Sequence, residues 1–221
     1  MTALRFGAAF ALVLPAAAAL ADTPSGAGPV PQPAPAAPAA TAQPAPDLPA
    51  DFLALFSDLC LNKFPDDAAL GAAAEDKHAT AMTPEQVRGY LHDDPGAGWI
   101  VKDSGGGADY VVLLEQPPFH ACSVRHISPV LYSPKAYMDA VEAHVGAKGN
   151  SLAPGTPQRV SLGGGAEAIG ATYPELDADR RPTGEAFITV IEYYPAGLAK
   201  DPRHGPLLEM RFVRQIYKKA N

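Results

Sequence analysis

The sequence predicts an α+β fold, in which a mainly antiparallel sheet packs against helices within a single domain. Helical patterns are grouped early in the body of the chain, and strand-like patterns joined by short turns follow them. The repeating strand–helix–strand units that predict a parallel sheet are missing. The body, residues 51–221, has about 171 residues, which is enough for one domain with a core of its own.

The first 50 residues predict export and a spacer. Arg5 precedes an apolar run from Phe6 to Leu20, and the small-x-small pattern Ala19-Leu20-Ala21 predicts that residues 1–21 are a cleaved signal peptide. Residues 22–50 are dominated by Pro and Ala, which predicts a disordered linker. No Cys lies at the predicted cleavage site, so no lipid anchor is expected. The apolar run is shorter than the roughly 20 residues of a membrane-spanning helix and no stop-transfer segment follows it, so no transmembrane segment is expected to remain. These features predict a periplasmic or secreted protein.

Three helices are predicted before the first strand. Asp51 is expected to cap the first helix, which carries an apolar stripe at helical spacing. The stripe consists of Phe52, Leu55, Phe56, Leu59 and Cys60. Phe64-Pro65 should end this helix, and the Ala- and Leu-rich segment 66–77 predicts a second one. Thr83-Pro84-Glu85-Gln86 has the pattern of a capping box, so a third helix should run to about Leu91.

Strand-like patterns begin after the turn-forming sequence His92-Asp93-Asp94-Pro95-Gly96. Segments 99–102 and 110–115 flank three glycines and predict a β-hairpin, with Trp99 at the start of its first strand. A strand over residues 119–127 should place alternate side chains on one face. These side chains are His120, Cys122, Val124 and His126.

One further helix and a set of strands complete the predicted domain. The helix should start at Ser133-Pro134 and end at Gly149, with an apolar stripe along it. The stripe consists of Tyr137, Met138, Val141 and Val145. The strands predicted after it span residues 159–162, 167–173, 187–194 and 207–217.

The composition argues against several classes of ligand and chemistry. The formal net charge of −7 disfavours nucleic acid or an anionic membrane as the main partner. The glycine runs 105–107 and 163–165 lack the pattern of a phosphate-binding loop. Neither a G-x-S-x-G elbow nor an S-x-x-K motif is present. We therefore predict no cofactor and assign no catalytic residue.

The two cysteines, Cys60 and Cys122, predict a disulfide, because an even number of cysteines in an exported chain is typically paired. Closing a loop of about 62 residues would stabilise the fold by roughly 4 kcal/mol in the chain-entropy model. The alternative is that Cys122 acts as a nucleophile or metal ligand beside His120 and His126. If the disulfide forms, the two histidines lie roughly 20 Å apart along a straight strand, too far for one ion, so no metal site is predicted.

Two segments carry candidate binding residues. His92, Asp93 and Asp94 are residue types of general acid–base chemistry and of metal sites, although a turn after a helix explains them equally well. Trp99 and Phe119 could present rings to a ligand, whereas the core is the commoner position for a tryptophan. The candidate binding residues are therefore His92, Asp93, Asp94, Trp99, Phe119, His120 and His126.

Several of these motifs together resemble a group of exported proteins. They are the run Asp93-Asp94-Pro95-Gly96 with Trp99, the segment Pro117-Pro118-Phe119-His120-Ala121-Cys122 and the upstream Cys60. The resemblance is to uncharacterised small exported proteins and lipoproteins of proteobacteria, and it covers roughly residues 52–217. It implies a location in the cell envelope and no particular activity. This chain departs from the lipoprotein members because it lacks a lipid-bearing Cys.

The sequence therefore predicts a non-catalytic binding or accessory module of the cell envelope. Its partner would be an envelope component, protein or glycan, contacted through the sheet face or the loop at Pro117-Pro118. The alternative is a small periplasmic hydrolase that uses His92 or His120 with nearby carboxylates. An imidazole within hydrogen-bond reach of Asp93, Asp94 or Ser123 in a deep cleft would favour the enzyme.

Overall fold

The computed structural model describes residues 45–163, 166–193 and 207–217, and these form an α+β domain, as predicted. The helices are α1 (Ala50–Phe56), the π-helix η1 (Ser57–Lys63), α2 (Asp67–Asp76), α3 (Pro84–Leu91) and α4 (Lys135–Ala147). The strands are β1 (Thr80–Ala81), β2 (Gly96–Val101), β3 (Tyr110–Glu115), β4 (Ala121–Ser128), β5 (Ser151–Leu152), β6 (Thr156–Gly163), β7 (Ala166–Leu176), β8 (Pro182–Tyr193) and β9 (Leu207–Ile216). The predicted signal peptide and most of the predicted linker lie outside the described residues.

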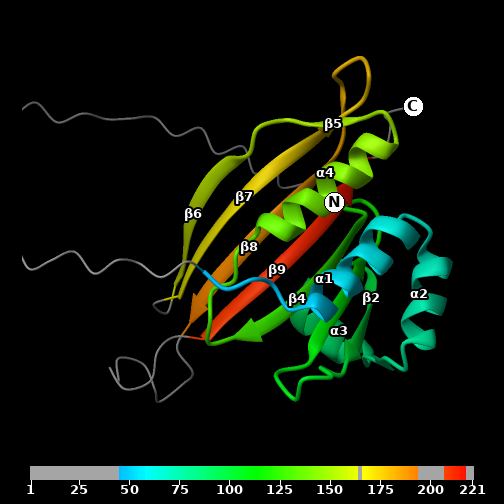
Figure 1. Cartoon of the computed structure of the whole chain (residues 1–221). Coiled ribbons are helices and arrows are strands. Elements are labelled where there is room, and N and C mark those ends of the chain that lie inside the picture. The colour runs from blue at the N-terminus through cyan, green and yellow to red at the C-terminus, as the bar shows by residue number, and fades with distance from the viewer. Residues whose placement is uncertain (1–44, 164–165, 194–206, 218–221) are drawn as a thin grey trace, which may run out of the picture. The chain divides into compact units, whose positions relative to one another are not determined.

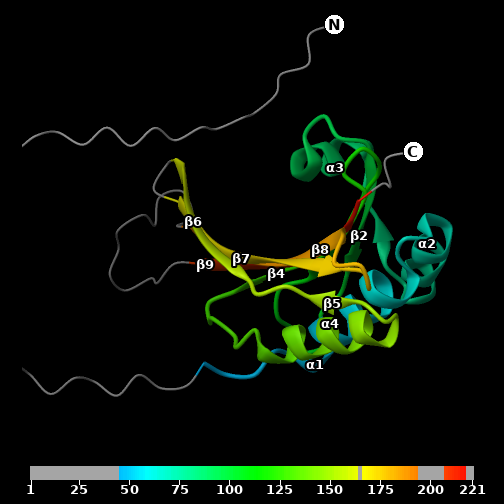
Figure 2. The ribbon, with the colours of Figure 1, turned by 90° about the horizontal axis from the view of Figure 1, so that it is seen from above.

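The strands form one antiparallel sheet in the order β1-β2-β3-β4-β9-β8-β7-β5, with β6 also paired to β7 (Figure 1). Helices α1, η1 and α4 cover one face of the sheet. Seen from above, the sheet is curved, and its concave side faces away from α1 and α4 (Figure 2). On the concave side, α3 covers the β2–β3 end, where Val87 and Leu91 pack on Leu113. We call the concave side of β4, β9, β8, β7 and β6 the open face.

The core lies between the helices and the sheet, and the predicted apolar stripes build it. The stripe residues of α1 and η1 are buried, as are Tyr137, Val141 and Val145 of α4. Phe212 of β9 stacks on Phe52 at 4.6 Å and on Tyr137 at 4.2 Å between ring centroids. Aromatic packing therefore holds the first helix and α4 on the same central strand.

The capping box of α3 and the glycine after α4 are confirmed, and α2 begins with a cap that was not predicted. Asp66 caps α2 through a hydrogen bond from the Ala69 N–H at 3.0 Å. Thr83 and Gln86 form the predicted capping box of α3, with one hydrogen bond in each direction. The left-handed residue after α4 is Gly149, with a φ of 74°. Each of these contacts joins residues close in sequence, so pattern alone could predict it.

Several predicted boundaries are wrong. Helix α1 starts at Ala50 with Pro49 in the capping position, not Asp51. Strand β4 starts at Ala121 rather than Phe119. Strand β2 starts at Gly96, because Gly96 pairs with Glu115 and leaves no room for a side chain: a Cβ there would lie 2.3 Å from the Leu114 oxygen. The glycines assigned to a turn therefore belong to the strand.

The structure differs from the prediction at the end of the linker and in two short strands. Leu48 is buried and the Pro46 oxygen accepts a hydrogen bond from the Ser133 N–H, so the last residues assigned to the linker pack on the domain. The short strands β1 and β5 were not predicted. The predicted strand end at Tyr194 lies outside the described residues.

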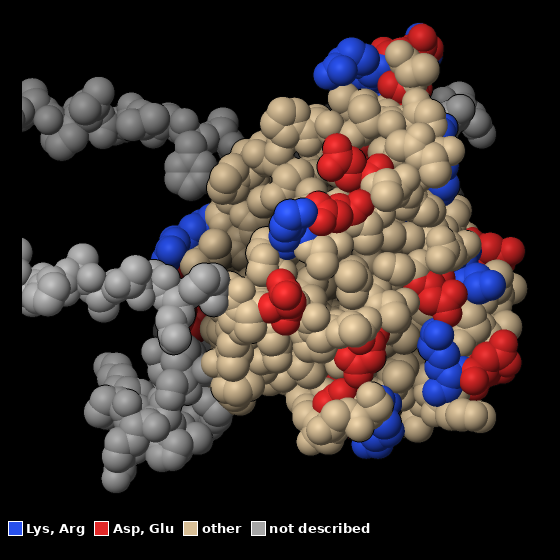
Figure 3. Space-filling view, in the orientation of Figure 1, with Lys and Arg blue, Asp and Glu red and all other residues tan. Residues whose placement is uncertain are grey.

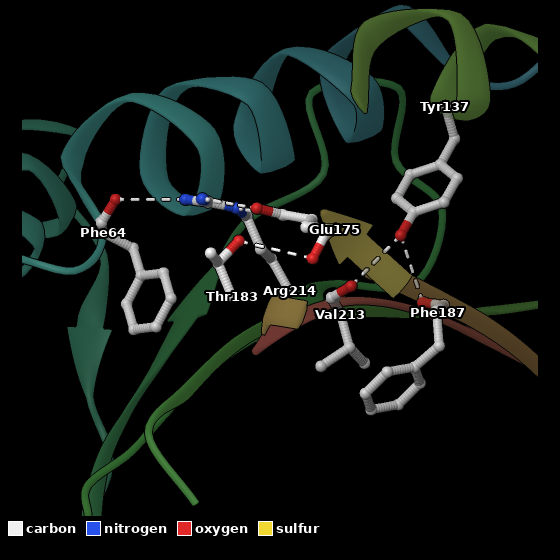
Figure 4. Close-up of polar contacts among 7 residues, drawn as sticks. All are labelled: Phe64, Tyr137, Glu175, Thr183, Phe187, Val213 and Arg214. Atoms are coloured by element: carbon white, nitrogen blue, oxygen red, sulfur yellow. Dashed lines mark hydrogen bonds and ion pairs between the residues drawn. The ribbon is translucent and has the colours of Figure 1, made fainter. Parts of the chain in front are cut away.

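Buried polar contacts also tie the helix side to the sheet (Figure 4). Arg214 of β9 forms a bidentate ion pair with Glu175 of β7, at 2.8 and 3.2 Å, and both side chains are about 3% exposed. Arg214 also donates to the Phe64 oxygen at 3.5 Å. The Tyr137 hydroxyl reaches the backbone oxygens of Phe187 and Val213, both of which also lie in the sheet. A hydroxyl and an ion pair that are buried in this way stabilise the fold only while every partner is present.

The lowered pKa of His144 in α4 leads us to expect that the protein loses stability in mild acid. Burial, then the charges of Arg214 and Lys148, lower the pKa of His144 to about 4, while Glu175 opposes them. The unfolded chain binds this proton near pH 6.5, so the free energy of unfolding should fall as the pH drops from 6.5 towards 4 and then level off. After discounting for solvent screening, we expect a loss of about 1 kcal/mol between pH 7.5 and pH 5.

Urea unfolding of the wild type and of His144→Gln at both pH values measures this effect. The variant should lose less stability on acidification than the wild type does, whatever its stability at pH 7.5. Equal losses would show that other groups cause the acid sensitivity.

Candidate functional site

The segment 117–126, which carries Cys122 and three of the candidate binding residues, is divided between the two faces of the sheet. Cys122 is bonded to Cys60, with Cα atoms 5.3 Å apart, so the predicted disulfide is confirmed. The bond joins η1 to β4 and removes Cys122 as a nucleophile or metal ligand. Within the described residues, no group of three or more His, Cys, Asp or Glu side chains could hold a metal ion.

His120 pairs with a carboxylate, but not with one of those predicted. Its Nε2 lies 2.7 Å from Asp67 Oδ1, and its ring packs edge-on against Phe64 at 4.7 Å. The side chain is 13% exposed. Ser123 has the opposite strand parity and faces the open side, so His120 and Ser123 cannot form a nucleophile–base pair. Phe119, the neighbouring candidate, is 52% exposed.

Four predicted candidates lie around one open cavity of about 460 Å³ beside α3. His92, Asp93, Asp94 and Trp99 line it together with Arg88. His92 ends α3 with a φ of 57°, and its N–H donates to the Arg88 oxygen. Trp99 is only 8% exposed and belongs to the main core, so its ring has a structural role. A ligand role for these four residues stays a prediction.

His126 lines a second cavity, of about 560 Å³, together with Asp51, Asp103 and Tyr110. Burial is the main cause that lowers the pKa of His126 and raises the pKa of Tyr110. Asp103 accepts hydrogen bonds from the backbone N–H groups of Gly105 and Gly107, and the Gly105 bond is the main cause that lowers its pKa.

The carboxylates of this second cavity have a structural role. Asp51 accepts hydrogen bonds from the Phe52 N–H and from the Ser104 hydroxyl. Because Asp51 stands at the start of α1 and Ser104 lies in the loop between β2 and β3, these bonds hold that loop on the helix. The carboxylates of Asp51 and Asp103 thus both accept hydrogen bonds from donors of the protein itself.

A third cavity, which the sequence did not reveal, lies in the floor of the open face. It has a volume of about 200 Å³, and we call it the arginine cavity. Strands β4, β9 and β8 contribute Ser123, Arg125, Thr189, Arg211 and Gln215 to its polar lining, and β3 contributes Glu115. Figure 4 shows the side chains of Phe187 and Val213 pointing away from Tyr137 and the helices, so they reach the open face. Phe187 is the aromatic part of the lining.

Strand register explains how these residues meet. Arg125 lies opposite Arg211 in the β4–β9 pair, and Arg211 lies opposite Thr189 in the β9–β8 pair. One polar row therefore crosses three neighbouring strands of the open face. A smaller hollow, of about 80 Å³, continues it over β8, β7 and β6 and shares Thr189 with the arginine cavity.

The charges of the cavity are closely coupled. Glu209 Oε1 lies 2.6 Å from Arg211 Nε and 3.6 Å from Arg125 Nη1. Burial, and then the charge of Arg211, lower the pKa of Arg125 to about 10, so its guanidinium stays protonated at neutral pH. Tyr90 of α3 lies under Arg125, with the guanidinium carbon 5.2 Å from the ring centroid. These contacts fix Arg125 against the end of α3.

The helix side of the molecule offers no comparable concentration of charge. In the view of Figure 3, acidic and basic side chains lie scattered over a larger uncharged surface. Isolated surface charges of both signs are typical of a solvated face. The open face brings hydroxyl, amide and guanidinium groups together in one hollow.

Sequence patterns contained part of the signal for the arginine cavity. Alternation along the predicted strands 119–127 and 207–217 separates Cys122, Val124, Met210 and Phe212 from Arg125 and Arg211. The pairing of two strands about 86 residues apart was not visible in any local pattern, so the two arginines could not be brought together.

No family model, curated protein or solved structure matches this chain. Within the described residues, none of the helices is both long enough and apolar enough to cross a membrane.

Proposed function

We propose that the protein is an exported, non-catalytic binding module of the cell envelope that holds its partner on the open face. The observation that carries this proposal is the arginine cavity, in which hydroxyl, amide and guanidinium groups converge on one side of a rigid sheet. The partner is an envelope component, protein or glycan.

Two further features support export and binding. The Cys60–Cys122 disulfide is typical of proteins that fold in an oxidising compartment, which is compatible with a periplasmic or secreted location. The predicted signal peptide and the Pro/Ala-rich spacer would deliver the domain to that compartment and hold it on an extended segment.

A hydrolase is the second candidate, and the His120–Asp67 pair is the observation in its favour. A carboxylate that orients an imidazole is part of many acid–base sites. Here, however, His120 lines none of the four cavities described above, and Ser123 faces the other side of the sheet. The geometry therefore favours binding over hydrolysis.

Filling the arginine cavity should abolish binding of the envelope partner. Mature chain (residues 22–221) would be immobilised and exposed to periplasmic extract from the source organism, followed by chemical crosslinking. The wild type should retain an envelope component, whereas Gln215→Trp, which fills the cavity, should retain at least about tenfold less. Mass spectrometry and glycan analysis would measure what is retained.

The matched control is Glu142→Trp, which adds the same ring to the exposed side of α4. It should bind as the wild type does. The assignment of the open face would be wrong if both variants bound equally well. The binding-module proposal itself would fail if the wild type retained no more than uncoated resin.

A further inference from the structure

The Arg125–Arg211 pair is the least expected feature of the open face. The two side chains lie directly opposite one another on β4 and β9, and like charges in that position cost stability. Glu209 is the carboxylate that contacts both of them. Glu209 is thus shared between two guanidinium groups, and an oxygen acceptor from a ligand can join the pair at the donors that Glu209 does not reach.

The buried Nε of Arg125 points to the same conclusion. It has no hydrogen-bond partner in the part of the chain that the structure describes. A buried N–H without a partner is costly, and an oxygen from a ligand would satisfy it. Glu115 also lines the cavity, and burial, then the charge of Asp94, raise its pKa, but it gives the Arg125 Nε no hydrogen bond.

The remaining lining suits a ring that carries hydroxyl groups. The side chains of Ser123, Thr189 and Gln215 make no hydrogen bond to the described residues, so their donors and acceptors are available. Phe187 contributes an aromatic surface on which the apolar face of a sugar can pack. The volume of about 200 Å³ has room for a single ring. The hollow of about 80 Å³ beyond Thr189 continues the face for a longer chain.

We infer that the arginine cavity binds the carboxylate of an acidic sugar, a hexuronate unit of an envelope glycan. The carboxylate would lie against Arg125 and Arg211, whose planar guanidinium groups match its two oxygens. The sugar hydroxyls would meet Ser123, Thr189 and Gln215. This inference rests on the proposed function, because it names the ligand class of the same open face.

NMR titration of the ¹⁵N-labelled mature chain with sodium D-glucuronate tests the inference. Glucuronate should shift the amide signals of β4, β9 and β8 around the cavity, and D-glucose should bind at least about tenfold more weakly because it lacks the carboxylate. Arg211→Gln should weaken glucuronate binding at least about tenfold. Thr189→Val, which keeps the shape but removes the hydroxyl, should weaken it about three- to tenfold.

Arg159→Gln is the matched control, because Arg159 is an exposed arginine of β6 that pairs with Glu167. It should bind glucuronate as the wild type does. The inference is overturned if glucose binds as well as glucuronate, if acetate or a Glu-Glu dipeptide binds equally well, or if the shifted signals lie elsewhere. Loss of the inference alone leaves the Gln215→Trp capture result intact, whereas failure of the proposed function removes both.

Discussion

Arg214→Ala is expected to lower the free energy of unfolding by about 3–5 kcal/mol. The substitution leaves the Glu175 carboxylate, about 3% exposed, without its bidentate partner in the interior. It also removes the donor to the Phe64 oxygen and the guanidinium that lies 5.9 Å from the Phe64 ring centroid. An uncompensated buried charge is much more costly than the loss of an exposed ion pair.

Urea unfolding followed by circular dichroism measures the effect. Arg159→Ala, which breaks the exposed Arg159–Glu167 pair, is the control and should cost less than about 1 kcal/mol. The double variant Glu175→Leu/Arg214→Met should recover much of the loss, because no charge is left buried. A loss below about 1 kcal/mol for Arg214→Ala would contradict the interior position of the pair.

Trp99→Ala is expected to cost about 3–5 kcal/mol and to reduce the yield of soluble protein. Trp99 is about 8% exposed and belongs to the main core cluster. Its ring packs over α2 so closely that a Cβ at Gly71 would lie 3.6 Å from Trp99 Cζ2. Removal of the ring would therefore open a cavity between β2 and α2 that the backbone cannot fill.

The measurement needs a probe other than fluorescence, since Trp99 is the only tryptophan. Circular dichroism in urea serves for the wild type, Trp99→Ala and Trp99→Phe. The phenylalanine variant keeps most of the apolar volume and should be less destabilised than the alanine variant. Nearly unchanged stability of Trp99→Ala would show instead that the ring is exposed at the cavity beside His92.

Local patterns predicted most of the fold. The stripe of α1 and η1, the capping box at Thr83 and the glycine after α4 can each be recognised from residues within a few positions of one another. The disulfide was predictable for another reason, because two cysteines allow only one pairing. The start of β2 was missed because a glycine in a strand and a glycine in a turn look alike until the partner strand is known.

The candidate sites were predicted less well, because they depend on pairings between distant segments. The hydrolase alternative named Asp93, Asp94 and Ser123 as partners for an imidazole, whereas the partner of His120 is Asp67 of α2, which lies 53 residues upstream. Arg125 and Arg211 meet only through the pairing of β4 with β9. Neither contact has a sequence signature, since side-chain alternation fixes the face of a strand but not its neighbour.

The sheet can be completed only after β9 has been made, because β9 joins two strands that precede it in the chain. β9 lies between β4 and β8, but it follows every other described strand along the chain. Until residues 207–216 arrive, β4 and β8 each present an unpaired edge, and such edges can pair with other chains. The missing contacts are also far apart in sequence, which slows their formation. If the chain crosses the membrane behind an N-terminal signal peptide, as the proposed export implies, β9 crosses last, and the edges of β4 and β8 stay open to pairing with other chains until then.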